Sequence, residues 1–203
     1  RRCDRLIAMS EPLQKRLCER TGKSAADVAV IPQYCEDFYA ESIEDAALAE
    51  RFGGRFNLVF TGTFTPAQSL DTVIRAVCRA RSLGAADLHL LLVGDGMSRE
   101  DLARLVDELG AGDCVTFYGS VPAKDIPRFT ALADALIVSL SDSPDLGLTV
   151  PAKVASYMAA GKPVIASMDG AGFEAIRTAG CGPACPACDV DALADSLVRL
   201  YRA

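Results

Sequence analysis

Short apolar runs alternate with amphipathic stripes along the chain from residue 57 onward. The runs are rich in β-forming residues, whereas the stripes repeat apolar residues at the i, i+3, i+4, i+7 spacing of a helix. Gly84 and Gly110 end the first two stripes, as glycines commonly end helices. The pattern predicts strands at 57–61, 88–93, 114–117, 135–139 and 163–167, and helices that begin at 70, 98, 126, 152, 173 and 190.

The run at 88–93 is apolar at nearly every position, so neither face of this strand is expected to meet water. Strands of this kind are typical of parallel sheets that lie between two layers of helices. The alternation therefore predicts an α/β fold, a doubly wound Rossmann-like parallel sheet with helices on both faces. The chain has too few strand–helix units for an eight-unit barrel.

Residues 1–56 follow a less regular pattern, with strands predicted at 6–9 and 28–31 and helices after Ser10 and at 43–52. We interpret this part as a connection that enters the regular domain from elsewhere. The chain opens with Arg1 and not with methionine, so we expect it to be a piece of a longer protein whose targeting segments lie outside it.

Composition restricts the classes of function. Half of the residues are apolar and 24% are charged, which predicts a folded domain with a substantial core. Lys and Arg total 21 against 27 Asp and Glu, and the net charge is −6. Nucleic acid is therefore an unlikely partner, because proteins that grip phosphate backbones normally carry the opposite balance. No apolar run is long enough to cross a bilayer.

The eight cysteines are too sparse for a disulfide scaffold, so we expect a reducing, cytoplasmic location. Cys3, Cys78 and Cys114 flank or lie in predicted elements and are expected to be small buried hydrophobes. The single histidine, His89, lies between two leucines of a predicted strand and is interpreted as a structural residue with satisfied hydrogen bonds. A catalytic histidine is expected to lie outside this chain.

Two motif-like spacings have plain structural interpretations. Gly94-Asp95-Gly96 follows a strand and precedes a helix, but Arg99 stands where a dinucleotide motif needs its third glycine, so we interpret it as a tight turn. Cys181, Cys185 and Cys188 have the spacing of an iron–sulfur motif. Few residues follow them and no histidine lies near, so we interpret them as structural thiols and predict no metal site.

Ligands of open parallel sheets bind beyond the carboxyl ends of the strands, which directs attention to the loops there. The stretch 141–153 follows a strand and runs into a helix with Pro151 near its first turn. Lys153 lies in that turn, where the helix dipole disfavours a cation and a bound anion would remove the penalty. The residues alone leave two alternatives open: a phosphate contact or a solvated surface lysine.

Several motifs together resemble the C-terminal, donor-binding domain of family 4 (group 1) glycosyltransferases of the GT-B fold. The resemblance covers nearly the whole chain, and the segment Ala-Gly-Lys-Pro-Val-Ile-Ala at 160–166 is fairly specific in this context. The matching segments are 30–34, 92–96, 115–121, 133–139 and 158–167.

The resemblance implies a protein with two Rossmann-like domains that face a cleft. Residues 1–25 resemble the last strand and helix of the N-terminal, acceptor-binding domain, residues 26–56 the inter-domain connection, and residues 57–203 the nucleotide-sugar-binding domain. The implied partners are a nucleotide-sugar donor and the missing acceptor domain of the same chain. The implied location is the cytoplasm, at the inner face of the membrane if the missing domain makes that contact.

The chain departs from the family at its charged positions. Thr63 and Gln68 stand where many members carry an Arg and a Lys that hold the donor diphosphate. The two glutamates that family members carry eight residues apart would fall at Leu148 and Ser156. An insertion would realign the first of them with Asp142 or Asp145. The segment 62–72, which contains Gln68, and the segment 150–153 together resemble a bacterial branch that builds surface polysaccharides. On that resemblance Lys153 takes over part of the phosphate contact.

The resemblance also implies where a donor would lie: the base against 119–121, the diphosphate between Gly62-Thr63 and a helix beginning near Thr149, and the ribose near Ser156. It implies a UDP-sugar, of which an N-acetylated amino sugar is one candidate, transferred with retention to a saccharide or lipid-linked acceptor. No cofactor, metal or catalytic residue is predicted within the chain. A UDP-sugar epimerase half and a non-catalytic nucleotide-binding module remain alternatives. The predicted donor-binding residues are Gly62, Thr63, Gln68, Gly119, Ser120, Val121, Gly147, Leu148, Thr149, Lys153 and Ser156.

Overall fold

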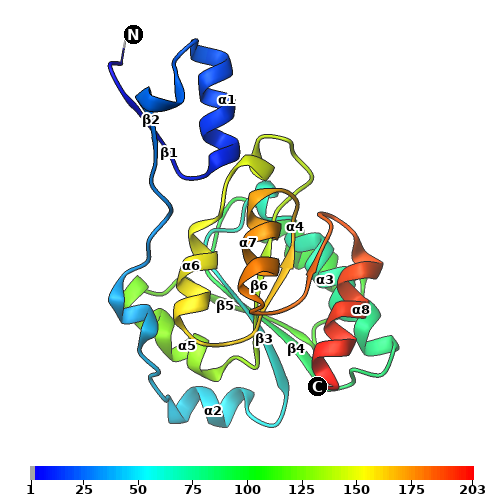
Figure 1. Cartoon of the computed structure of the whole chain (residues 1–203). Helices are drawn as coiled ribbons and strands as arrows, with labels where there is room; N and C mark the ends of the chain where they lie inside the picture. The colour runs from blue at the N-terminus through cyan, green and yellow to red at the C-terminus, as the bar shows by residue number, and fades with distance from the viewer. Residues whose placement is uncertain (1–2) are drawn as a thin grey trace.

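A six-stranded, wholly parallel sheet forms the centre of the computed structural model, which describes residues 3–203 (Figure 1). The strand order is β5-β4-β3-β6-β7-β8, which is the doubly wound order of a Rossmann-like fold. The strand order reverses between β3 and β6, so this is the switch point where such sheets open a crevice. The strands are β3 (Phe56–Thr61), β4 (Leu88–Val93), β5 (Val115–Gly119), β6 (Ala135–Ser139), β7 (Val164–Ser167) and β8 (Ala184–Cys185).

Helices cover both faces of the sheet and bury two separate apolar clusters. One cluster lies beneath α3 (Leu70–Ser82), α4 (Arg99–Glu108) and α8 (Val190–Tyr201). The other lies beneath α2 (Ala46–Phe52), α5 (Ile126–Leu132), α6 (Ala152–Ala159) and α7 (Ala171–Ala179). The predicted α/β architecture with helices on both faces is confirmed.

The strand side chains explain why the central runs are apolar throughout. In β3, Leu58 and Phe60 pack into the first cluster, whereas Val59 packs into the second. Successive residues of a strand point to opposite faces, so a sheet covered on both faces needs apolar residues at every position.

A small second sheet lies apart from the main one (Figure 1). It pairs β1 (Leu6–Ala8) with β2 (Val28–Val30) in parallel, and α1 (Glu11–Thr21) packs against both strands. Ile7 is 66% exposed and Ile31, just beyond β2, is 54% exposed, so this sheet has apolar residues that nothing in the described chain covers. The Ser10 hydroxyl caps α1 and also donates a hydrogen bond to the Leu148 carbonyl, which links this part to the α/β body.

The connection between the two sheets contains a short 3₁₀ helix, η2 (Asp37–Ala40), and then α2. Asp45 begins α2 by accepting the backbone N–H groups of Ala47 and Leu48, and it forms an ion pair with Arg128 of α5. None of the helices within residues 3–203 is long and apolar enough to cross a membrane.

Three predictions of local structure were wrong in detail. Cys3 is exposed and not buried, because β1 begins three residues beyond it, whereas Cys114 is buried and Cys78 half-buried. The helix predicted to begin at 98 begins at Arg99, and Ser98 before it has a helical backbone and makes no side-chain capping hydrogen bond. The helix predicted at 43–52 begins only at Ala46, where Asp45 provides the cap.

Candidate functional site

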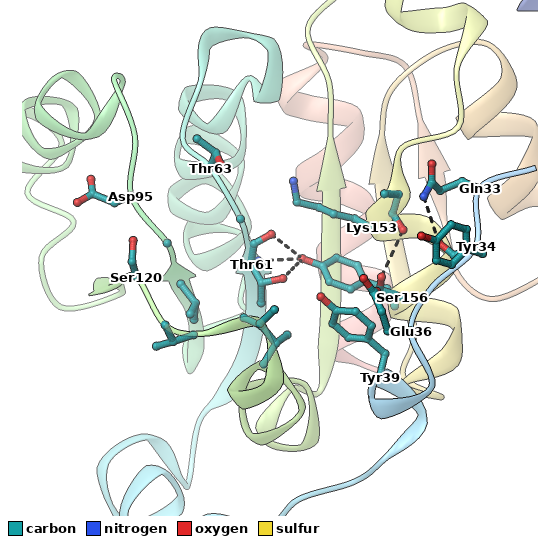
Figure 2. A pocket seen from close by; sticks show the side chains of 18 residues that line it. Gln33, Tyr34, Glu36, Tyr39, Thr61, Thr63, Asp95, Ser120, Lys153 and Ser156 are labelled. Atoms are coloured by element: carbon teal, nitrogen blue, oxygen red, sulfur yellow. Dashed lines mark hydrogen bonds between the residues drawn. The ribbon is translucent and has the colours of Figure 1, made fainter. Parts of the chain in front are cut away.

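A cavity of about 540 Å³ opens at the carboxyl ends of β3, β4 and β5, beside the switch point (Figure 2). The loops after these strands form its floor, α6 forms one side, and the connection before η2 forms another. The strand ends and a helix N-terminus therefore meet at one place, as ligand sites of this fold require.

Tyr157 of α6 fills the point where β3 and β6 part. The described pairing of these strands ends at Val59 and Leu136, so the N–H of Thr61 has no carbonyl partner on β6. The Tyr157 hydroxyl accepts this N–H at 2.8 Å and lies 3.2 Å from the Thr61 hydroxyl, as the dashed lines of Figure 2 show. Burial raises the pKa of Tyr157 to about 12, so its hydroxyl stays protonated.

Glycines let two loop backbones meet on the cavity floor. Gly62 and Gly94 both have positive φ, and a Cβ on Gly94 would lie 1.9 Å from the Gly62 carbonyl oxygen. A Cβ on Gly96 would likewise lie 2.3 Å from the Phe64 carbonyl oxygen. The two glycines at 94 and 96 therefore serve backbone packing, in agreement with their interpretation as a tight turn.

Lys153 reaches from the first turn of α6 across this floor. Its Nζ donates a hydrogen bond to Gln68 Oε1 at 2.9 Å and lies 4.5 Å from the centre of the Phe60 ring. A Cβ on Gly62 would lie 3.0 Å from the same nitrogen. The ammonium therefore lies directly against the Gly62 backbone, in space that a side chain at position 62 would fill. Burial lowers the pKa of Lys153 to about 8, because the ammonium has lost part of its water. Lys153 is thus half-buried and its ammonium is held by Gln68, whereas its contact with a phosphate stays a prediction.

The structure brings together most of the predicted donor-binding residues. Six of them line the cavity: Gly62, Thr63, Ser120, Val121, Lys153 and Ser156. Gln68 contacts the cavity through Lys153, and Gly119 precedes Ser120, its carbonyl accepting the Gly94 N–H at 2.8 Å.

Three predicted residues lie elsewhere. Gly147 and Leu148 line a different hollow of about 690 Å³, between the start of α1 and the start of α7. Thr149 lines neither hollow, and its hydroxyl donates to the Leu146 carbonyl at 3.0 Å. The reason is that the helix begins at Ala152, and the 3₁₀ turn η5 (Leu146–Leu148) directs the preceding residues away.

The two acidic residues considered for realignment do not reach the Lys153 cavity either. Asp142 lines the second hollow, together with Glu11, Asp169 and Glu174, whereas Asp145 begins η5. The described carboxylates that line the first cavity are Glu36 and Asp95.

Sequence reasoning missed the cavity residues of the connection: Gln33, Tyr34, Glu36 and Tyr39. Gln33 and Tyr34 lie in the segment 30–34 that resembles the family, but no binding role was drawn from it. No local pattern marks Glu36 and Tyr39, because a connection without regular secondary structure can pass any side of the domain. Tyr157 was also missed, although a signal existed. It lies four residues after Lys153, and side chains at i and i+4 of a helix share a face.

The remaining candidate residues behave as structural groups. His89 is buried, with Nδ1 3.1 Å from Asn57 Oδ1 and Nε2 2.9 Å from Thr116 Oγ1, which confirms the prediction. Burial lowers its pKa to about 4, so the ring is neutral. The Cys185 thiol donates to the Ala166 carbonyl, and burial raises its pKa to about 11. The metal content of the protein stays a prediction.

Comparison with known proteins identifies the family. Residues 55–203 match the family described as Glycosyl transferases group 1. The chain belongs to this family. It is 29% identical, over 94% of its length, to 51% of the GDP-mannose-dependent alpha-(1-6)-phosphatidylinositol monomannoside mannosyltransferase of Mycolicibacterium smegmatis. It is also 36% identical, over 55% of its length, to 29% of the lipopolysaccharide core biosynthesis glycosyltransferase LpsD of Rhizobium meliloti.

A solved structure has the same fold over nearly the whole chain. HepE of Anabaena, in complex with UDP-glucose, superposes with a TM-score of 0.82 at 20% identity, covering 98% of this chain and 54% of that chain. At this identity the likeness extends to the fold, which is the Rossmann-like domain of GT-B proteins. The chain spans about half the length, or less, of the relatives it matches.

Proposed function

We propose that this chain is the nucleotide-sugar-binding half of a retaining glycosyltransferase. In this proposal the diphosphate lies over the bare backbone at Gly62 and Thr63 and contacts Lys153. The base lies against Ser120 and Val121, and the ribose lies near Ser156. The observation that carries the proposal is the Lys153 ammonium, held over a glycine turn at the carboxyl end of β3 and open to a cavity.

The chemistry of the leaving group supports this arrangement. When the sugar departs, negative charge develops on the diphosphate, and a fixed cation with few waters stabilises it more than a solvated one does. Lys153 stands at the N-terminal end of α6, whose backbone N–H groups add a partial positive charge. We propose that the positive charge of Lys153 and of the α6 N-terminus replaces the Arg and Lys that many family members carry at the positions of Thr63 and Gln68. We propose that it acts without a cofactor.

We propose UDP as the donor nucleotide, with GDP as the second candidate. UDP-glucose is bound by HepE, whose fold this chain shares, whereas the name of the mycobacterial mannosyltransferase specifies GDP-mannose. An N-acetylated amino sugar remains the proposed group for transfer on the resemblance alone.

We propose that a second domain of the same protein binds the acceptor. Two observations support it: the chain spans about half of its relatives, and the β1–β2 sheet exposes Ile7 and Ile31. Parallel sheets are normally covered on both faces, so these residues fit beneath further elements. The similarity to LpsD supports a place in bacterial surface-polysaccharide synthesis. On the family resemblance alone we propose a cytoplasmic location, with membrane contact made only by that second domain.

The proposal is tested by measuring UDP and uridine affinity by calorimetry in the parent chain and in Lys153→Ala. A charge-assisted contact to phosphate is worth roughly 1.5–3 kcal/mol, so UDP binding should weaken by about ten- to a hundredfold while uridine binding is retained. The matched control is Lys162→Ala, since Lys162 lies beyond the other end of α6 and donates to the Ala131 carbonyl outside the cavity.

Equal loss of UDP and uridine binding in Lys153→Ala, or no loss, would contradict the phosphate assignment. GDP and guanosine are measured in parallel to decide between the two nucleotides. Transfer to an acceptor, compared with epimerisation of the free donor by the two-domain protein, separates a transferase from an epimerase. Neither activity, with nucleotide binding intact, would indicate a non-catalytic binding module.

A further inference from the structure

Two side-chain contacts run from α6 to the segment at the end of β3, across the switch point of the sheet. In the first, the Tyr157 hydroxyl accepts the Thr61 N–H. In the second, the Lys153 ammonium donates to Gln68 Oε1 at 2.9 Å. Gln68 ends the 3₁₀ turn η3 (Pro66–Gln68), which follows β3, whereas α6 follows β6. The contact between Lys153 and Gln68 therefore joins the two halves of the sheet beside the cavity.

The backbone of η3 is held in place from β6. Ser139, the last residue of β6, is fully buried, and its hydroxyl donates to the Gln68 carbonyl. The Ser141 N–H, just beyond β6, donates to the Ala67 carbonyl at 2.9 Å. Because both hydrogen bonds hold the turn, the Gln68 side chain leaves the backbone at a fixed point, from which its amide oxygen meets Lys153.

Gln68 gives Lys153 a hydrogen-bond acceptor that carries no charge. Among the ion pairs and hydrogen bonds of residues 3–203, Gln68 is the one partner of the Lys153 ammonium. Burial lowers the pKa of Lys153, and no neighbouring charge offsets this effect. The positive charge is therefore held in place without being neutralised.

The surrounding titratable groups leave this charge uncompensated. Those that line the cavity with Lys153 are Glu36 and Tyr39 of the connection, Asp95 after β4, and Tyr157 of α6. The two tyrosines are uncharged, because burial raises the pKa of both phenols. On the neighbouring loops, Asp71 accepts from the Ser69 hydroxyl at 3.4 Å, and Asp142 lines the second hollow.

The neutrality of Gln68 favours an anionic ligand. A carboxylate at this position would form a permanent ion pair with Lys153, and a diphosphate would have to compete with it. An amide oxygen accepts one of the three N–H groups of the ammonium and leaves the other two for a ligand. It also leaves the full unit charge, and a charge with few waters attracts an anion more strongly than a solvated charge does.

We infer that Gln68 is a positioning residue, which holds the Lys153 ammonium over Gly62 and leaves its charge to be neutralised by the diphosphate of the nucleotide. This inference rests on the proposed function, which places the diphosphate at Gly62 and Thr63. Gln68 does not itself line the cavity, so it acts through Lys153 and needs no contact with the donor.

Nucleotide binding should therefore be linked to the protonation of Lys153. In the free chain the ammonium loses its proton near its pKa of about 8, whereas a bound diphosphate favours the charged form. UDP affinity should then fall as the pH rises above about 8, and it should fall more steeply than uridine affinity.

The first measurement follows Lys153 in the chain without nucleotide, by NMR titration of lysines labelled with ¹³C at Cε. The Lys153 signal is assigned by its absence from Lys153→Ala. Gln68→Glu should raise the pKa of Lys153, because a carboxylate stabilises the ammonium. Gln68→Met has a similar length but no acceptor, and it should lower this pKa, because a hydrogen bond to the charged form is lost. Thr65→Ala is the matched control on the same turn, since Thr65 makes no side-chain capping hydrogen bond and does not line the cavity.

The second measurement compares UDP and uridine affinity by calorimetry on both sides of pH 8. Gln68→Glu should weaken UDP binding by about tenfold or more and abolish the steeper fall above pH 8, because Lys153 stays charged but paired. Gln68→Met should weaken UDP binding by about five- to tenfold and move the fall to lower pH. Uridine binding should be retained in both variants, and Thr65→Ala should match the parent chain throughout.

The outcomes separate this inference from the proposed function. An unchanged pKa of Lys153 in both Gln68 variants overturns the positioning role, whatever the nucleotide affinities are. Parent-like UDP binding at every pH in both variants, while Lys153→Ala weakens it, also overturns that role and leaves the proposed function standing. Equal loss of UDP and uridine overturns it as well, because it indicates general damage to the cavity. Failure of the parent chain to bind UDP or GDP overturns the proposed function and this inference together.

Discussion

Two side chains of α6, one helical turn apart, give the cavity its positive charge and fix the backbone beneath it. Lys153 brings a cation over Gly62, and Tyr157 satisfies the N–H of Thr61 at the end of β3. In the proposed function Lys153 contacts the diphosphate, and Tyr157 holds the end of the strand above which the Lys153 ammonium lies. Both depend on the same short helix, so the charge and its backbone support keep one geometry.

Tyr157→Phe should destabilise the fold by about 1–3 kcal/mol, because it leaves the buried N–H of Thr61 without an acceptor while the ring still fills its place. Urea unfolding of the variant measures this difference. Tyr34→Phe is the control, since the Tyr34 ring is exposed and its hydroxyl makes no described hydrogen bond. Equal stability of Tyr157→Phe and the parent would show that water replaces the hydroxyl without cost.

The lowered pKa of Lys153 predicts a pH-dependent stability. Its folded pKa is about 8, below the ordinary 10.5, so between these values the unfolded chain binds a proton that the folded chain does not. The free energy of unfolding should therefore gain a contribution that rises with pH across this window. Lys153→Met lacks the group and should be more stable than the parent below about pH 8, with the gap closing toward 10.5. Unfolding both proteins across this range measures the gap, and a gap independent of pH would contradict the assigned pKa.

At the scale of elements, apolar periodicity was enough to predict the main sheet. The strands at 88–93 and 135–139 match β4 and β6 at both ends. Asp87 and Gly94 flank the first run, whereas Asp134 precedes the second run and the polar Ser139 is its last residue. The two-residue strand β8 was not predicted, since so short a segment has no period and is defined by pairing with β7.

The residues of the site also differ in how far the sequence could predict them. Topology predicted the strand-end loops and the family resemblance predicted their donor-binding residues, whereas Glu36 and Tyr39 enter the cavity only through the path of the connection.

Gly94→Ala should harm the loop pair far more than an ordinary glycine substitution. Gly94 and Gly110 both have positive φ, but a Cβ on Gly94 meets the Gly62 carbonyl at 1.9 Å and one on Gly110 meets nothing within 4 Å. Gly110→Ala should cost about 1–2 kcal/mol of stability from backbone strain alone. Gly94→Ala should cost about 1–3 kcal/mol more, because the two loops must separate. Denaturant unfolding of both variants tests the order, and equal losses would mean that the loops yield without strain.

At the scale of the whole molecule, residues 3–203 carry the proposed donor-binding groups, and the acceptor site is proposed to lie in a second domain. Transfer needs donor and acceptor held in reacting geometry, and losing one side forfeits an effect of about 7–11 kcal/mol. The purified chain should therefore bind nucleotide but transfer no sugar from UDP- or GDP-sugars to saccharide or lipid-linked acceptors. Product formation is followed by mass spectrometry, with the full-length mycobacterial mannosyltransferase and GDP-mannose as the positive control. Acceptor glycosylation by residues 1–203 alone would contradict this expectation.

The close approach of Gly62 and Gly94 also bears on how such a protein can change its substrate over time. The floor of the cavity is backbone that tolerates no side chain at position 94, whereas Thr63, Lys153 and Ser156 line the cavity with side chains. Under the proposed function, substitutions at these three positions would exchange one donor for another without disturbing the two loops. The loop backbones can thus stay the same while the side chains proposed to contact the donor change. Family membership then remains recognisable, although the preferred sugar differs between members.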